Sequence, residues 1–374
     1  MESQKSVLVK DSRGLTDFFK GIAILLVILV HSRVYFDLSF AQSAVQRFGQ
    51  MGCQIFFVLS SYGLCHSFYK RIPTWFAHMK KRISKLAVGF WGAILIHVIY
   101  RIITAVISGG NILAAIDVPG VIINAFFLNG FVPFGGINNV VVRGGWYVGT
   151  TVILYAIFPL LFKFYFSDKI KVWQKYRFAI FPLVVFLATS VVVVIAGFVH
   201  PVFLCSNNSF VYFSFVNQLT PFALGIVLFD ISRRFNSSKL FPCFSLVLLM
   251  ISAILFYGEY KYSFVFCPSF VAASFVFFYL YILNNKMTYN GINENKNVIV
   301  RIISRFGKIS FSIYLIHSFI VYDFSILCLR FLRPVYNNDF LWYLILLPIE
   351  YCLIYVLGSI YNKCVSRIEK TRET

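Results

Sequence analysis

Residues 21–38 read GIAILLVILVHSRVYFDL, and this stretch decides the class of fold. Its first ten residues, Gly21 to Val30, carry no polar side chain. A helix needs about 20 apolar residues to cross a bilayer, and somewhat fewer where the crossing is short. A basic arm before an apolar run also suits a secretory signal, but no small-residue cleavage site follows closely enough. We therefore predict a first transmembrane helix that is retained.

Long apolar runs recur through the rest of the chain. Apolar residues form 59% of its 374 residues and charged residues 13%, against about 45–50% and about 25% in a soluble domain. We predict an all-α integral membrane protein, one domain over residues 1–374 with about ten transmembrane helices. The expected spans are 21–38, 52–69, 87–107, 146–166, 178–199, 210–230, 241–258, 262–283, 309–330 and 340–361.

The basic residues lie mainly in every second connection between these spans. A net charge of +20 would suit nucleic-acid binding if it formed one soluble patch. Alternation between connections instead follows the positive-inside rule, which places both chain ends in the cytoplasm. The cytoplasmic parts would include an arm at 1–20, a flexible Asn-rich linker at 284–308 and a tail at 362–374. The basic residues that do not follow this alternation are Arg33, Arg47, Arg101, Arg143, Lys261, Arg330 and Arg333.

One expected outer loop is long. Residues 108–145 are rich in Gly and contain the apolar piece Val121–Phe134. This piece fits a re-entrant or interfacial helix, which is tolerated at membrane depth only where protein or water lines it. A plain surface loop fits equally well. The eight Cys residues show no metal-ligand spacing, so we predict no metal site.

His31 is the first candidate for chemistry, because polar groups inside a bilayer are costly and often functional. It is expected about half-way through the first span. Lys20 lies eleven residues earlier, which on a helix is the same face about 16 Å away. Each residue also has a structural explanation: His31 as a hydrogen-bond partner between helices, and Lys20 as a side chain that reaches the membrane surface.

His317 is the second candidate. Ser310, Tyr314 and His317 form one stripe on the ninth expected span. Both imidazoles are expected at similar depths, which suits a shared cavity and acid/base catalysis near neutral pH. Hydrogen bonding between helices is the alternative explanation for this stripe.

Further polar residues fall inside expected spans. Gln54 and Ser61 are seven residues apart and share a helical face. Asp323 suits a structural ion pair, and Glu350 is a candidate for a catalytic or orienting role. The arginines considered as partners for the two acids are Arg33 and Arg101.

Several segments together resemble the bacterial membrane acyltransferase-3 family, over about residues 14–325. The first is LTDFFKGIAILLVILVHS (15–32), and the second is GCQIFFVLSSYGLCHSFYKR (52–71). FAHMKKRISKL (76–86), GGWYVGTTVILYAIFPLL (144–161) and FGKISFSIYLIHSF (306–319) follow in the order of the family. Members of this family move an acyl group, typically acetyl from cytoplasmic acetyl-CoA, onto hydroxyls of surface glycans.

The resemblance implies roles for particular residues. His31 would be the catalytic histidine, and Lys20 occupies the position of an arginine in the family pattern. Arg82, with Lys81, would contact the CoA phosphates. The chain departs from the pattern in two further positions of the second span, where Gln54 replaces an acidic residue and Ser61 a glycine. The fourth span also lacks the glutamate found in some members.

We therefore hypothesise an O-acetyltransferase of the bacterial cytoplasmic membrane. It would move acetyl from acetyl-CoA to a sugar hydroxyl of a cell-surface polysaccharide, such as O-antigen or capsule, or its lipid-linked precursor. The expected catalytic residues are His31, His317 and Glu350; the expected donor-binding residues are Lys20, Lys81 and Arg82; the expected acceptor-binding residues are Gln54, Ser61, Trp146 and Tyr314.

The sequence is compatible with more than one mechanism and more than one function. His31 could act as a general base or carry the acetyl group transiently. A transporter or flippase for a glycan lipid, or a polysaccharide polymerase, would also suit a protein of this size with ionisable groups in its spans. Only the acyltransferase requires CoA, so binding of CoA discriminates among these functions.

Overall fold

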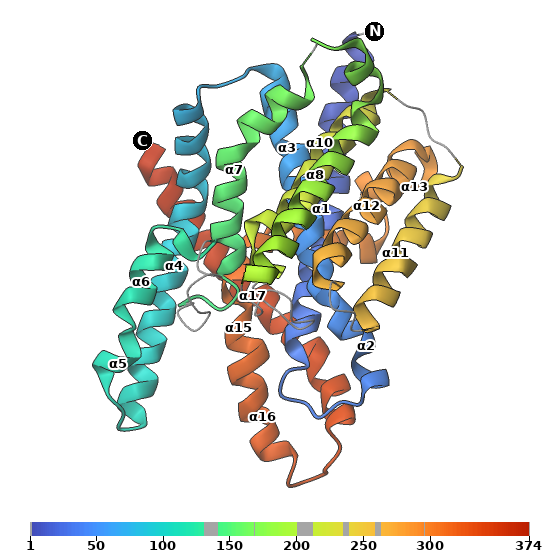
Figure 1. The fold of residues 1–374 in the computed structure, drawn as a ribbon. Coiled ribbons are helices and arrows are strands. Elements are labelled where there is room, and N and C mark those ends of the chain that lie inside the picture. The colour runs from blue at the N-terminus through green and yellow to red at the C-terminus, as the bar shows by residue number, and fades with distance from the viewer. Residues whose placement is uncertain are drawn as a thin grey trace.

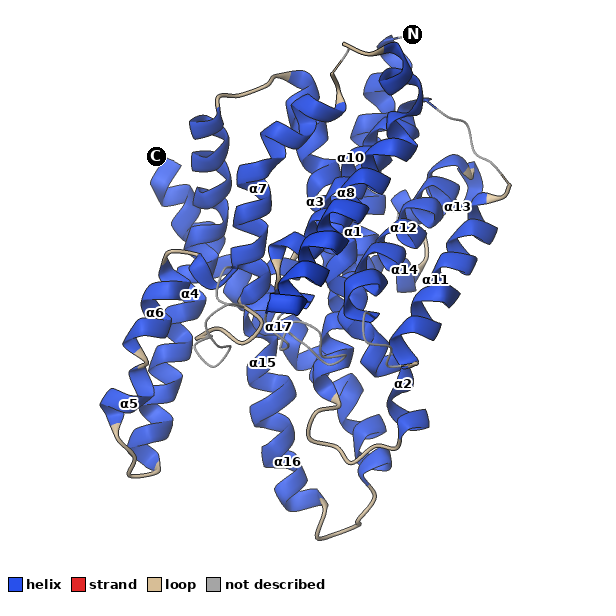
Figure 2. Cartoon of the chain, viewed as in Figure 1, coloured by secondary structure: helices blue, strands red, loops and turns tan. Residues whose placement is uncertain are grey.

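The computed structural model describes residues 2–130, 141–167, 169–199, 212–234, 239–258, 263–294 and 296–373. Within these ranges the regular structure is helical and contains no strand (Figure 2). Eight of the described helices are long and apolar enough to cross a membrane. The prediction of an all-α, multi-pass membrane protein is confirmed.

Each expected span coincides with a helical segment in the described part of the chain (Figure 1). These segments are α1 (Glu2–Ser32), α3 (Gly52–Lys70), α4 (Trp75–Ile107), α7 (Trp146–Tyr165), α8 (Lys171–Val199), α10 (Phe215–Arg234), α11 (Phe241–Tyr257), α12 (Ser263–Asn284), α15 with α16 (Ser310–Ser318 and Ser325–Leu332) and α17 (Asp339–Glu373). Helix α11 has only 17 residues, and α3 is mostly buried within the bundle.

The first span begins and ends earlier than its apolar run indicates. We expected residues 21–38, whereas the apolar stretch of α1 is Arg13–Ser32. The upstream residues are helical because they also pack: Leu15 and Phe19 are buried in the core. His31 therefore lies in the last turn of α1, and the prediction that it lies half-way through the span is wrong.

The stretch 284–308 is not a flexible linker. It forms α13 (Lys286–Asn293) and α14 (Val298–Lys308). The side chain of Asn285 accepts a hydrogen bond from the backbone N–H three residues on (3.2 Å), and that of Asn297 from the N–H two residues on (2.8 Å). Two of the Asn residues that suggested flexibility therefore cap the starts of helices, a position that Asn favours.

Helix α14 packs directly on α1. A Cβ atom on Gly307 would collide with the backbone carbonyl of Asp17, and one on Gly21 would collide with that of Ile303. Glycine allows the two backbones to approach this closely. The stretch expected to be a linker is therefore part of the helical bundle.

The expected outer loop 108–145 is partly helical. It contains α5 (Ile112–Ile116), α6 (Val118–Ala125) and a short 3₁₀ turn at Leu128–Gly130. Helices α5 and α6 lie alongside α4 (Figure 1), and the indole N–H of Trp91 on α4 donates to the carbonyl of Ala125 (2.9 Å). Residues 131–140 lie outside the described part. The described portion packs on the bundle, and a re-entrant position in the membrane stays a prediction.

Both chain ends lie toward the same end of the bundle (Figure 1). Helix α17 continues without a break through the expected tail as far as Glu373. This arrangement agrees with an even number of crossings. That the shared end faces the cytoplasm stays a prediction from the positive-inside rule.

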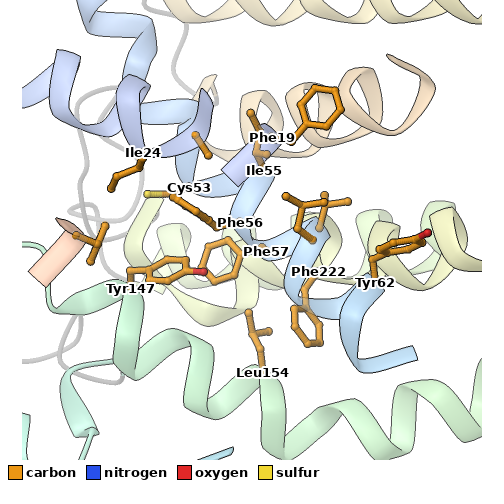
Figure 3. Packing of buried hydrophobic residues seen from close by; sticks show 14 of the residues in the cluster. Phe19, Ile24, Cys53, Ile55, Phe56, Phe57, Tyr62, Tyr147, Leu154 and Phe222 are labelled. Carbon is orange, nitrogen blue, oxygen red and sulfur yellow. The ribbon is translucent and has the colours of Figure 1, made fainter. Parts of the chain in front are cut away.

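Aromatic packing fixes the helices that carry the polar residues. Phe57 of α3 packs against Tyr147 of α7, with ring centroids 4.8 Å apart. Leu154 of α7 and Phe222 of α10 fill the same region (Figure 3), and both are fully buried. Such dense packing holds α1, α3, α7 and α10 in a fixed arrangement.

Candidate active site

His31 lies beside a cavity of about 600 Å³ near the end of α1. The cavity wall combines aromatic rings with two arginines and one imidazole. The lining residues are Val27, Val30, His31, Val34, Tyr35, Gln50, Cys53, Arg101, Asn129, Arg143, Gly144, Trp146, Tyr212, Phe213, Tyr314 and Tyr322. A cavity of this size, with a few polar groups among apolar walls, is typical of a small-molecule site.

The structure brings the two predicted histidines together. The rings of His31 and His317 have centroids 5.2 Å apart. Nδ1 of His317 lies 2.7 Å from the backbone carbonyl oxygen of Tyr314. A carbonyl can only accept, so Nδ1 of His317 donates, and in the neutral ring Nε2 is the basic nitrogen. His317 is buried behind His31 and does not itself line the cavity.

Tyr322 is the closest polar partner of His31. Its phenol oxygen lies 2.6 Å from Nδ1 of His31. Tyr322 belongs to a π-helical segment, Phe319–Phe324, that joins α15 to α16. Such wide turns are rare and occur frequently at functional sites. The hydrogen bond fixes which ring nitrogen of His31 is left to face the cavity.

Arg143 also contacts Tyr322. Its guanidinium carbon lies 4.9 Å from the Tyr322 ring centroid, and its Nη1 lies 3.7 Å from Oδ2 of Asp323. The ion pair expected for Asp323 is therefore present. Its partner is Arg143, whereas the sequence pointed to Arg33 and Arg101 as candidates.

Two of the residues predicted to bind the acceptor line the cavity. Trp146, at the start of α7, stacks on Phe213 with ring centroids 4.7 Å apart. Tyr314 donates its hydroxyl proton to the carbonyl of Gly144 (2.6 Å). Flat aromatic surfaces of this kind suit the apolar face of a sugar ring.

The other two, Gln54 and Ser61, do not line the cavity. Gln54 is fully buried, donates from Nε2 to Oε1 of Gln218 (2.9 Å) and accepts from the Tyr212 hydroxyl (3.3 Å). Ser61 is also fully buried, at the close contact between α3 and Gly225 of α10. Both side chains therefore face neighbouring helices, and the structure does not bring them to the His31 cavity.

Lys20 lines a second, smaller cavity of about 180 Å³ on the same helix as His31. Tyr314 lines both cavities and thus lies between them. Ser60, Thr151 and Tyr155 contribute to the wall of the smaller cavity. Lys20 and His31 therefore open onto neighbouring spaces, as the shared helical face predicts.

Arg82 approaches the Lys20 cavity through Tyr155. Its guanidinium carbon lies 6.0 Å from the Tyr155 ring centroid. Its Nε is buried and has no hydrogen-bond partner in the described part of the chain. Lys81 is exposed and lines neither cavity. The structure thus gathers Lys20 and Arg82 around Tyr155, while Lys81 lies apart.

Glu350 on α17 is buried outside the cavity. It is 1% exposed, and the hydroxyl of Ser325 donates to its Oε1 (2.5 Å). Its other oxygen has no partner among the described residues. Ser325 directly follows the π-helical segment that carries Tyr322. Within the described part of the chain, the hydrogen bond to Ser325 therefore connects Glu350 to the site.

The sequence did not single out Tyr322, and it marked Arg143 only as a basic residue outside the inner connections. Arg101 was marked in the same way, and also as a candidate partner for Asp323 and Glu350. That exception to the positive-inside pattern was the available signal for both arginines. Tyr322 gave no signal of its own, since the chain has 22 Tyr residues. In the described ranges, no group of three or more His, Cys, Asp or Glu side chains could hold a metal ion.

A family model described as an acyltransferase domain matches residues 16–359. The matched range contains both histidines and the whole cavity wall described above. A comparison with curated proteins found no match. A comparison with solved structures also found none.

Proposed function

The chain belongs to this acyltransferase family, and on that premise we propose that it is an O-acetyltransferase that uses acetyl-CoA. Its acceptor would be a sugar hydroxyl of a cell-surface polysaccharide or of its lipid-linked precursor. It would act in the bacterial cytoplasmic membrane, with both chain ends in the cytoplasm. The observation that carries this proposal is the pairing of His31 with Tyr322 and His317 at a cavity large enough for a sugar ring.

His31 is the proposed general base. When the N–H group at Nδ1 of His31 donates a hydrogen bond to the Tyr322 oxygen, Nε2 keeps its lone pair and can take the proton of the acceptor hydroxyl. The sugar oxygen then attacks the thioester carbonyl carbon, and the carbon–sulfur bond breaks. The departing CoA thiolate takes the proton back from the His31 imidazolium. Every proton is accounted for, and His31 returns to its starting form.

His317, which is buried behind His31, would support this chemistry. Its Nδ1 is fixed by the Tyr314 carbonyl, so Nε2 remains the basic nitrogen of a neutral ring close to His31. A neutral neighbour allows His31 to become positively charged during the reaction, whereas a protonated neighbour would oppose that charge. We therefore propose that His317 stabilises the imidazolium of His31.

The donor would approach from the Lys20 side. Lys20 and Arg82, gathered around Tyr155, would hold the phosphates of CoA, which cationic side chains bind well. The pantetheine arm would then run past Tyr314, which lies between the two cavities. Lys20 and His31 are eleven residues apart on one helix, about 16 Å, which an extended arm can span.

The acceptor would occupy the aromatic side of the His31 cavity. Trp146, Phe213 and Tyr212 form adjacent ring surfaces there. Sugars bind to such surfaces through their apolar faces, while their hydroxyls reach polar groups at the edge. Arg101 and Arg143 line the same cavity and supply donors for those hydroxyls.

The deciding experiment is acetyl-CoA turnover by the purified full-length protein in proteoliposomes. We expect release of free CoA, faster with extracts of surface glycans, and a loss of at least about 100-fold in His31→Ala. His66→Ala is the matched control, because this imidazole on α3 packs on Phe229 and does not line the cavity. Undiminished CoA release in His31→Ala would exclude the mechanism. No CoA binding in the wild type would favour a transport function instead.

A further inference from the structure

A third cavity, of about 610 Å³, lies where α3, α7 and α10 end and α8 begins. It shares no lining residue with the His31 cavity or the Lys20 cavity. Five basic side chains and one acidic side chain line it together with aromatic rings. The charged residues are Lys70, Arg71, Arg177, Asp230, Arg233 and Arg234.

Two of the arginines and a tyrosine bind the acidic residue. Asp230 accepts from Nε and Nη2 of Arg177 at 3.1 and 3.0 Å, and from the hydroxyl of Tyr165 at 2.9 Å. Nε of Arg234 lies 2.8 Å from the same carboxylate. Arg177 and Asp230 are both buried, so this cluster is a fixed structural element of the cavity wall.

The remaining three cations have no acid within ion-pair distance in the described part of the chain. They are Lys70, Arg71 and Arg233, and all three are exposed at the cavity. The cavity wall therefore carries a marked positive excess. An anion bound in the cavity would reduce that excess.

Stacking holds one of these cations in place. The guanidinium carbon of Arg233 lies 3.7 Å from the ring centroid of Tyr69 and 5.2 Å from that of Phe229. This contact uses the face of the guanidinium and leaves the N–H groups in its plane available as donors. The positive-inside rule accounts for basic residues at this end of the helices, but not for a cavity with a pre-positioned arginine.

We propose that this cavity binds a phosphate group. Arginine donors in a fixed plane match phosphate oxygens, and a nearby lysine adds charge. The aromatic rings beside them suit the organic part of a phosphate ester. The ligand could be a soluble organic phosphate or the headgroup of an anionic phospholipid, because the cavity lies at the helix ends. This site is separate from the donor site proposed around Lys20 and Arg82.

The test uses purified full-length protein with two probes. Inorganic pyrophosphate is titrated by calorimetry, and phosphatidylglycerol, with phosphatidylcholine for comparison, is added to delipidated protein for native mass spectrometry. The double variant Lys70→Gln with Arg233→Gln should bind at least about tenfold more weakly. Lys363→Gln, an exposed lysine on α17 outside this cavity, is the matched control for loss of charge.

Saturable pyrophosphate binding that the double variant weakens would identify a soluble phosphate ligand. Selective retention of phosphatidylglycerol, weakened by the same variant, would identify a lipid. The proposal is overturned if neither probe binds saturably, or if Lys363→Gln weakens binding equally. It is also overturned if Arg82→Gln, rather than the double variant, removes binding. His31→Ala should bind both probes normally, so failure of acetyl transfer and failure of this site can be told apart.

Discussion

The hydroxyl oxygen of Tyr322 lies 2.6 Å from Nδ1 of His31, and this hydrogen bond joins the last turn of α1 to a π-helical turn between α15 and α16. The imidazole is thereby oriented from one side. Arg143 packs over the phenol ring, so Tyr322 is itself held in place. Orientation of a catalytic imidazole by a bonded neighbour determines which nitrogen can take part in proton transfer.

Tyr322→Phe should therefore lower kcat without a comparable rise in KM for acetyl-CoA. The variant keeps the ring and removes only the hydrogen bond to His31, which we expect to cost about tenfold in rate. Steady-state kinetics in proteoliposomes measure both constants. Tyr351→Phe is the matched control, since it removes a hydrogen bond from another tyrosine to the same helix, at the Leu25 carbonyl (3.0 Å). A rise in KM with unchanged kcat in Tyr322→Phe would contradict this role.

The number and type of helices could be predicted because they depend on composition and on the length of the apolar stretches. Apolar stretches of the length of a bilayer locate the spans with no knowledge of their neighbours. Boundaries set by tertiary contacts could not be found this way. Helix α1 starts early because Leu15 and Phe19 pack into the core. The Asn-rich composition of 284–308 predicts a flexible segment, although Asn side chains such as those of Asn285 and Asn297 also favour helix starts.

The site was predictable where a polar residue stood out inside an apolar run. His31, His317 and Tyr314 were found in this way, and the structure gathers them. Tyr322 could not be placed by periodicity. It follows His317 by five residues, which is about 140° away around a regular α-helix. The π-helical turn closes over five residues, and the sequence gives no sign of that turn. Gln54 and Ser61 share a face as expected, but other helices cover it.

Glu350 is expected to act on the reaction only through the π-helical turn. Glu350→Ala removes the acceptor of the Ser325 hydroxyl and should lower kcat about tenfold, because Tyr322 loses part of its support. Glu350→Gln keeps an acceptor oxygen and should retain most of the activity. In the background of Tyr322→Phe, Glu350→Ala should cost little more, which a double-mutant cycle measures. An equal and large loss in Glu350→Gln and Glu350→Ala would indicate direct catalysis by the carboxyl group.

Lys20 is expected to contribute to donor binding more than to the chemical step. Lys20→Ala should raise KM for acetyl-CoA about tenfold with a smaller change in kcat, because it removes a cation that we propose contacts the donor both before and during the reaction. Lys20→Arg should bind the donor at least as well, since a guanidinium offers two donors to one phosphate. Lys163→Ala, an exposed lysine on α7 outside the Lys20 cavity, controls for surface charge. A fall in kcat alone in Lys20→Ala would place this lysine at the chemical step instead.

The close contact between α1 and α14 predicts a site that is sensitive to a single methyl group. Gly307→Ala would place a Cβ atom against the backbone carbonyl of Asp17, which cannot move without shifting α1. Overpacking of this kind costs about 1–3 kcal/mol, so thermal unfolding in detergent should begin several degrees lower than in the wild type. Gly291→Ala on α13 is the matched control, because nothing lies within 4 Å of its Cβ position. Alanine is also the better helix former, so that variant should be neutral or slightly stabilising. If the two variants unfolded at the same temperature, α14 would not be held against α1 as the structure has it.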